Sequence, residues 1–125
     1  MSLYHGLFVR ATAVPDLNVN ISEGLMEFGD AMVFVAETPL AVTAAGGGLA
    51  KLAIVQINSS GTCSIKYSSS VAVASQSTLE HPAPDSGQRL LAKLFTAAAP
   101  ILNATTAIAN ANINNKVKDA VYGGR

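Results

Sequence analysis

Three acidic residues, Glu23, Glu27 and Asp30, form the densest group of carboxylates in the chain. Paired carboxylates carry out glycoside hydrolysis, and carboxylate oxygens are the ligands that calcium prefers. The group lacks the alternating oxygen ligands and the terminal glutamate of an EF-hand loop. The chain also has no tryptophan that could stack on a sugar. We therefore interpret these three residues as a solvated turn.

The histidines and the single cysteine are the other groups that could do chemistry. His5 and His81 are not spaced with each other or with a cysteine as a zinc site requires, and both are expected to be exposed loop histidines. Cys63 excludes an intrachain disulfide. Its neighbours, Thr62 and Ser64, offer no cation that would lower the thiol pKa. A buried, inert thiol is predicted.

A glycine run, Gly46–Gly48, precedes Lys51 and invites comparison with a phosphate-binding loop. Such a loop needs a glycine, four residues and then Gly-Lys-Ser/Thr at the start of a helix. Lys51 instead follows Ala50 and enters an expected strand, so we interpret the glycines as a flexible connector. There is no Gly-x-Ser-x-Gly elbow either. The sequence thus predicts no enzyme, no cofactor and no metal site.

The elements that would position these residues are mostly short strands. Residues 1–14 end at a Val-Pro-Asp break and form either a first strand or an extended arm that packs on a neighbour. Leu17–Ile21 alternates apolar and polar residues, which is typical of a half-buried strand. Ala31–Ala36 is an apolar run of strand formers that Pro39 is expected to end, and Leu40–Thr43 is a weaker strand.

The clearest local pattern is a hairpin in the middle of the chain. Lys51–Ile57 is the first strand, Asn58–Gly61 is the turn, and Cys63–Ser68 is the return strand. Gly61 is free to take a positive φ. The alternation of residues in the return strand predicts one buried and one solvated face.

The last part of the chain leaves alternatives open. Ser68–Gly87 is rich in serine, alanine and proline and is predicted to be a long loop. Arg89–Phe95 fits a helical stripe or a strand. Apolar residues recur every four positions around Asn114–Val121, which is compatible with a short C-terminal helix. The fold class is therefore all-β or nearly so: one small β domain over residues 15–125, preceded by the strand or arm of residues 1–14.

Composition indicates how such a domain would work. Of 125 residues, 50% are hydrophobic and only 13% are charged, against about 25% in a typical soluble domain. Eight basic and eight acidic residues balance without clustering, so no nucleic-acid-binding face is expected. No apolar run reaches the roughly 18 residues of a membrane span, and the N-terminus lacks the pattern of a signal peptide. The surplus of apolar surface is best explained by burial between subunits.

About half of the chain, from Gly48 to roughly Asn115, resembles a modular β domain of tailed-bacteriophage virion proteins, found in head-decoration, baseplate and tail-fibre proteins. The matching parts are two strands with a small-residue turn, a loop with alternating prolines, a further strand and a closing phrase: Leu52–Ile57, Thr62–Tyr67, His81–Asp85, Gln88–Leu94 and Ala107–Ile113. The chain departs from the pattern after Ile113, where an Asp-Arg type ending is expected and Asn114-Asn115-Lys116 stands instead.

The resemblance implies a small antiparallel β-sandwich or jelly-roll-like module that is usually trimeric, and it implies a strand at Arg89–Phe95. The expected function is a structural virion protein, specifically a homotrimeric head-decoration (cement) protein that binds the major capsid protein. A baseplate, neck or tail-fibre attachment subunit is the first alternative. A carbohydrate-binding module and a small hydrolase are alternatives from other classes. Residues 1–14 and Ser68–Gly87 are the expected contact elements, unless both only cover the subunit's own core.

Overall fold

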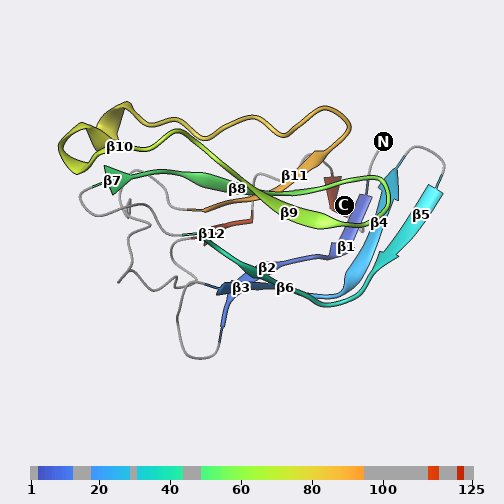
Figure 1. Cartoon of the computed structure of the whole chain (residues 1–125). Coiled ribbons are helices and arrows are strands. Elements are labelled where there is room, and N and C mark those ends of the chain that lie inside the picture. The colour runs from blue at the N-terminus through green and yellow to red at the C-terminus, as the bar shows by residue number, and fades with distance from the viewer. Residues whose placement is uncertain are drawn as a thin grey trace.

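The computed structural model describes residues 3–12, 18–28, 31–43, 49–94, 113–115 and 121–122 of the chain. The described residues form strands, joined by turns and by one short 3-10 helix (Figure 1). The elements are β1 (Leu3–Gly6), β2 (Val9–Ala11), β3 (Asn18–Ile21), β4 (Gly24–Phe28), β5 (Ala31–Val35), β6 (Thr38–Ala41), β7 (Leu49–Ala50), β8 (Ala53–Ile57), β9 (Cys63–Tyr67), β10 (Val71–Ala72), η1 (Val73–Thr78), β11 (Arg89–Leu94), β12 (Ile113–Asn114) and β13 (Val121–Tyr122).

The strands of the N-terminal third of the chain, together with β13, form one layer that is bent at a corner. Sheet order β13-β1-β4-β5 continues around the corner into sheet order β2-β3-β6. Three antiparallel chain segments therefore run through both sheets: β1 with β2, β3 with β4, and β5 with β6. At the corner Gly6 and Leu7 take positive φ values of 76° and 58°. Phe8 is fixed there by Ser22, whose backbone N–H donates to the Phe8 carbonyl and whose hydroxyl accepts from the Phe8 N–H, both at 2.9 Å.

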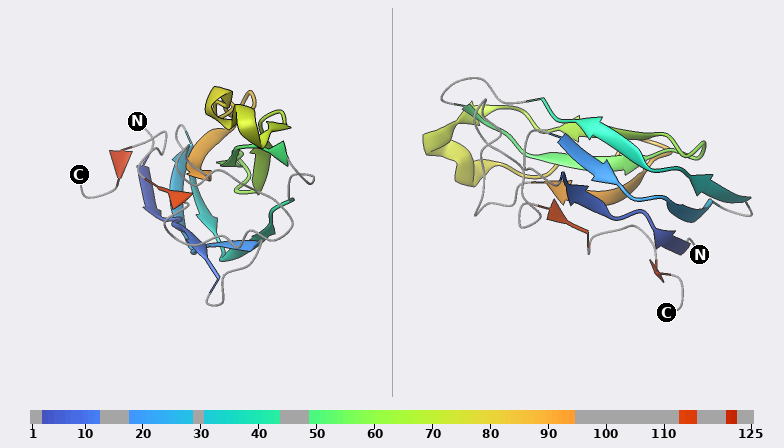
Figure 2. Two further views of the ribbon diagram at one scale, coloured as in Figure 1. Left: turned by 90° about the vertical axis from the view of Figure 1, so that its left-hand side faces the viewer. Right: turned by 90° about the horizontal axis from the view of Figure 1, so that it is seen from below.

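The second layer is a four-stranded sheet of order β12-β11-β8-β9. It faces the bent layer, and the views of Figure 2 show the two layers on opposite sides of the molecule. Leucine, isoleucine and valine side chains from both layers fill the space between them, including Ile21, Val55 and Leu91. β8 is the most buried strand, because all five of its residues are buried. The described fold is all-β and β-sandwich-like, as the sequence predicts.

Most of the expected strands are present. The predicted hairpin is β8–β9, and Gly61 in its turn has the expected positive φ of 86°. Arg89–Phe95, for which strand and helix were both open, is the strand β11 over its described residues. Pro39 does not end a strand. It lies inside β6, at the edge of its sheet, where a missing N–H breaks no ladder bond.

The expected short C-terminal helix is not found where the structure describes this region. Residues 113–114 form β12, which pairs with β11, and residues 121–122 form β13, which pairs in parallel with β1. The intervening residues 116–120 lie outside the described part, as do residues 107–112 of the closing phrase. The described residues contain no helix with the length and apolar character of a membrane span.

Of the two options for residues 1–14, the described residues 3–11 take the strand. β1 pairs with β4 and β2 pairs with β3. Leu7 and Val9 are fully buried in the core. This part of the expected contact element therefore covers the subunit's own core.

The prediction that one face of the β8–β9 hairpin is solvated is wrong for β8. Ala53, Val55 and Ile57 belong to the core between the layers. The alternate residues Ile54 and Gln56 point the other way, and yet both are buried. The reason is that the proline-rich stretch of the long loop lies over this outer face of the sheet.

Candidate functional site

The largest exposed apolar side chains of the described residues gather on the β4–β5 hairpin. Met32 and Phe34 of β5 are 55% and 62% exposed, and Leu25 of β4 is 38% exposed. Scattered exposed apolar residues are normal on a protein surface, whereas a contiguous group marks an interaction site. The two other exposed large residues, Phe8 and Leu49, lie on different elements.

The strand register explains why these side chains share one face. Leu25 is the cross-strand partner of Phe34, and Glu27 is the partner of Met32. Directly opposed residues of an antiparallel pair project from the same side of the sheet. We call the surface made by Leu25, Glu27, Met32 and Phe34 the β4–β5 face. Since the alternate residue Met26 is fully buried in the core, the hairpin is apolar on both sides.

The free edge of β5 adds to this surface. β5 is the last strand of its sheet, and no other described strand pairs with its outer edge. Natural sheets protect such edges with charged residues or prolines. The edge strand β6 has this protection, with Pro39 inside it. β5 reads Ala-Met-Val-Phe-Val and has neither, which is typical of a strand that another chain covers.

The β4–β5 face is not among the features that the sequence predicts. The sequence predicts a strand at Ala31–Ala36 without indicating how exposed it is. It predicts no strand at β4, because Glu23 and Glu27 are interpreted there as part of a solvated turn. A signal was nevertheless present. Gly29-Asp30 separates two apolar segments, and a two-residue Gly-Asp spacing is typical of a β-hairpin.

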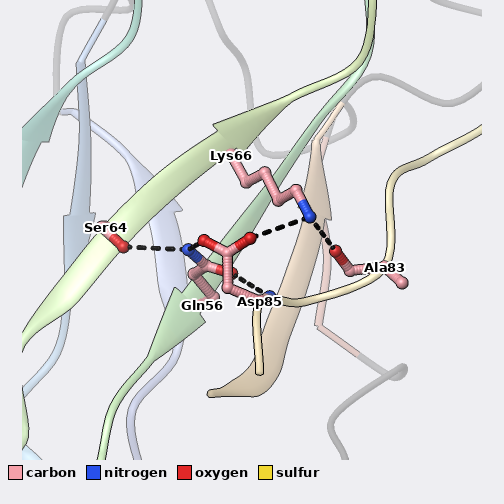
Figure 3. Close-up of polar contacts among 5 residues, drawn as sticks. All are labelled: Gln56, Ser64, Lys66, Ala83 and Asp85. Carbon is pink, nitrogen blue, oxygen red and sulfur yellow. Dashed lines mark hydrogen bonds and ion pairs between the residues drawn. The ribbon is translucent and has the colours of Figure 1, made fainter. Parts of the chain in front are cut away.

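A polar cluster on the outer side of β8 holds the long loop in place (Figure 3). The Gln56 side chain donates to Asp85 Oδ2 at 3.0 Å and to Ser64 Oγ at 3.3 Å, and its oxygen accepts from the Asp85 backbone N–H at 3.0 Å. Lys66 Nζ contacts Asp85 Oδ1 at 2.9 Å and donates to the Ala83 carbonyl at 2.8 Å. Every polar atom of the buried Gln56 amide thus has a partner, and the cluster works as a clamp.

Acid should weaken this clamp. Hydrogen bonds from Gln56 and then from Lys66 hold the pKa of Asp85 below its usual range. Because the pKa of Asp85 is lower in the folded protein than in the unfolded chain, its carboxylate contributes fully to the free energy of unfolding above the unfolded pKa of about 4. This contribution is lost as the pH falls through the folded-state pKa. We expect the stability difference between wild type and Asp85→Asn, measured by urea unfolding, to shrink between neutral pH and about pH 3. An equal difference at both pH values would contradict this role.

His81 belongs to the same loop and has a structural contact. Its Nε2 lies 3.0 Å from the carbonyl oxygen of Leu94, and the residue is half-buried. The expectation of an exposed loop histidine is therefore wrong for His81, because the loop folds back on β11. The prediction that all of Ser68–Gly87 is loop is wrong for its first half, which contains β10 and the 3-10 helix η1. Its second half, through Ala83 and Asp85, lies on the subunit's own sheet.

Lys51 is buried against an aromatic ring. Its side chain is only 8% exposed, and Nζ lies 3.9 Å from the centre of the Tyr67 ring. Burial lowers the pKa of this lysine. The Tyr67 hydroxyl in turn accepts a hydrogen bond from the Thr43 backbone N–H at 2.7 Å. Lys51 thus packs as a cation on a ring face, while the glycine run that prompted the phosphate-loop comparison lies outside the described residues.

The acidic group of the sequence does not form one turn. Glu27 lies in β4 and pairs across to Met32, so the solvated-turn interpretation is wrong for it. Glu23 is exposed just before β4, and Asp30 lies outside the described residues. His5 is in the strand β1 and not in a loop. Within the described ranges, no group of three or more His, Cys, Asp or Glu residues could hold a metal ion.

Cys63 is buried, as predicted, and burial raises its pKa to about 11. At neutral pH the thiolate, which is the reactive form, is therefore scarce. We expect Cys63 to react with a thiol-specific disulfide reagent far more slowly in the folded protein than in urea-unfolded protein at the same pH. Similar rates in both states, followed by absorbance of the released thiol, would contradict a buried thiol.

No family model, curated protein or solved structure matches the chain. On the described surface, the β4–β5 face and the free edge of β5 are the features best suited to binding another protein chain.

Proposed function

We propose that the chain is a structural subunit that works by association with other protein chains, specifically a homotrimeric head-decoration (cement) protein of a tailed bacteriophage. The observation that carries the association is the β4–β5 face next to an unprotected apolar edge strand. Met32, Phe34 and Leu25 expose large apolar surface there, and β5 itself contains no charged residue or proline.

Burial of this face would be favourable. Full burial of a methionine, phenylalanine or leucine side chain stabilises by about 1.5–3 kcal/mol relative to exposure. The three side chains here have between a third and two-thirds of their surface left to bury. The balanced formal charge of the chain gives little net repulsion between copies, and a net charge near zero favours association.

The virion setting is proposed from the sequence resemblance. Three of the matching segments, Leu52–Ile57, Thr62–Tyr67 and Gln88–Leu94, contain β8, β9 and β11, which are neighbours in one sheet. The proposed partners are copies of the chain and the major capsid protein, and the proposed location is the virion. A baseplate, neck or tail-fibre attachment subunit is the alternative within the same class.

Two measurements test the proposal in order. Sedimentation equilibrium of the full chain should give a mass three times the 12.8 kDa of one chain. Co-sedimentation with capsids that lack the protein should then show saturable binding. A monomer at all concentrations overturns the assembly proposal. A stable trimer that stays in the supernatant overturns the cement role and favours a tail or baseplate position.

A further inference from the structure

An open cavity of about 400 Å³ lies where β4 ends and β11 begins. It is lined by Phe28, Gly87, Gln88 and Arg89. Phe28 comes from the bent layer and the other three residues come from the approach to the second layer. The cavity involves no residue of the β4–β5 face.

Arg89 is the distinctive group of this cavity. Its guanidinium carbon lies 4.7 Å from the centre of the Phe28 ring. The residue is half-buried, and Nε is buried without a hydrogen-bond partner among the described residues. No ion pair to Arg89 is present in this part of the chain either. A buried, charged donor without an acceptor is costly, and the ring face offsets only a part of that cost.

The carboxylate closest in sequence is already committed. Asp85 is paired with Lys66 at 2.9 Å and also accepts from Gln56. Its backbone carbonyl accepts from the Gln88 N–H at 3.0 Å, which closes the turn before β11. The turn therefore presents Arg89 to the cavity without supplying a counter-charge.

The backbone beside Arg89 leaves room for a ligand. Gly87 has a φ of 79°, and a Cβ placed on it would meet no atom within 4 Å. Gln88 adds a second buried polar atom, Oε1, that has no partner among the described residues. The cavity thus combines an open approach, an aromatic wall and the unpaired Arg89 donor. The Gln88 oxygen is an acceptor, so it would take a donor from a ligand or from water and does not itself favour an anion.

Arg10 provides an internal comparison. Its guanidinium carbon lies 5.8 Å from the Phe8 ring, in another open cavity that also contains Asn115. There the arginine is exposed, so water solvates its charge. The Asn115 amide is engaged with the Val9 backbone N–H and carbonyl, both at 2.9 Å. This second cavity lacks the half-buried cation that a counter-charge would stabilise.

We propose that the Phe28–Arg89 cavity is a binding site for a carboxylate. The planar guanidinium fork matches the two oxygens of a carboxylate, and its remaining donors can bind them together. The Phe28 ring, whose centre lies 4.7 Å from the guanidinium carbon, forms one wall of the site. A free small carboxylate and an acidic side chain of a protein partner share this chemistry. The inference goes beyond the proposed assembly function and does not depend on it.

The Arg89 Nε–Hε resonance of the full ¹⁵N-labelled chain tests the proposal directly. Two probes are titrated: succinate, and a capped Gly-Glu-Gly peptide. Their neutral counterparts are succinamide and a capped Gly-Gln-Gly peptide. We expect a saturable shift of the Arg89 resonance with at least one acidic probe and none with its neutral counterpart. A shift with the peptide alone identifies a protein side chain as the source, and a shift with succinate identifies a free carboxylate.

Variants give the second readout. Loss of a charge-assisted hydrogen bond should weaken binding of the acidic probe about tenfold or more in Arg89→Gln, while Arg10→Gln should bind like wild type. If neither acidic probe shifts the wild-type resonance, or if the neutral probes shift it equally, the proposal is overturned. Because this measurement uses the wild-type chain, it holds even if Arg89→Gln fails to fold.

Discussion

The variant Phe34→Lys should dissociate the proposed oligomer while leaving the subunit folded. Phe34 is 62% exposed, so in the isolated subunit the change should alter the free energy of unfolding by no more than about 0.5 kcal/mol. In an assembly that buries the β4–β5 face, the lysine would place a charge in an apolar contact. Substitution at interface positions of this kind costs about 2 kcal/mol or more of binding free energy. The association should therefore be roughly thirtyfold weaker.

Sedimentation equilibrium over a concentration series measures the effect, with urea unfolding as the check on the subunit. Met32→Lys should act in the same direction, since Met32 lies on the same face of the same strand. Leu49→Lys is the matched control, because Leu49 is also a partly exposed apolar residue but lies on β7. An unchanged oligomer in Phe34→Lys, or equal dissociation in Leu49→Lys, would remove the β4–β5 face from the interface.

The all-β class was predictable because its signals are local. Alternation in residues 18–21 marks a strand with one buried face, and β3 has the burial pattern that this alternation requires. The β8–β9 hairpin was predictable from its turn, where Gly61 supplies the positive φ. Such features depend on neighbours in sequence, which a single chain displays.

The features that were missed depend on residues far apart in sequence. Gln56 is buried only because Asp85 and the loop around it fold over β8, and nothing within the strand indicates this. The helix expected near the C-terminus rested on a four-residue apolar period. At residues 113–114, pairing with β11 decides in favour of a strand, which is a tertiary effect that overrides a local pattern.

The candidate site was hidden for a related reason. The composition indicated surplus apolar surface, but it could not place that surface. Met32 and Phe34 belong to an apolar run that is indistinguishable from a buried strand in sequence. Their exposure follows from the position of β5 at the end of its sheet, and edge position is a property of the topology.

The variant Gly6→Ala should be the most damaging of the alanine substitutions at Gly6, Gly61 and Gly87. Gly6 has a φ of 76°, and a Cβ there would overlap the backbone carbonyl oxygen of Glu23. Backbone atoms cannot rotate away as a side chain can, so β1 would have to separate from β4 at their pairing of Gly6 with Gly24. This overlap adds to the cost of a side chain at a positive φ. We therefore expect the free energy of unfolding to fall by about 3 kcal/mol or more.

Two other glycines with similar φ values separate backbone strain from overlap. At Gly87, with a φ of 79°, a Cβ would meet nothing within 4 Å, so Gly87→Ala should show the conformational cost alone, about 1–2 kcal/mol. At Gly61, with a φ of 86°, a Cβ would lie 3.0 Å from Val33 Cγ1, and that side chain can adjust. Urea unfolding should therefore rank the losses as Gly6→Ala, then Gly61→Ala, then Gly87→Ala. Equal losses at Gly6 and Gly87 would show that the corner between β1 and β2 does not depend on this close backbone contact, and that positive φ alone decides the cost.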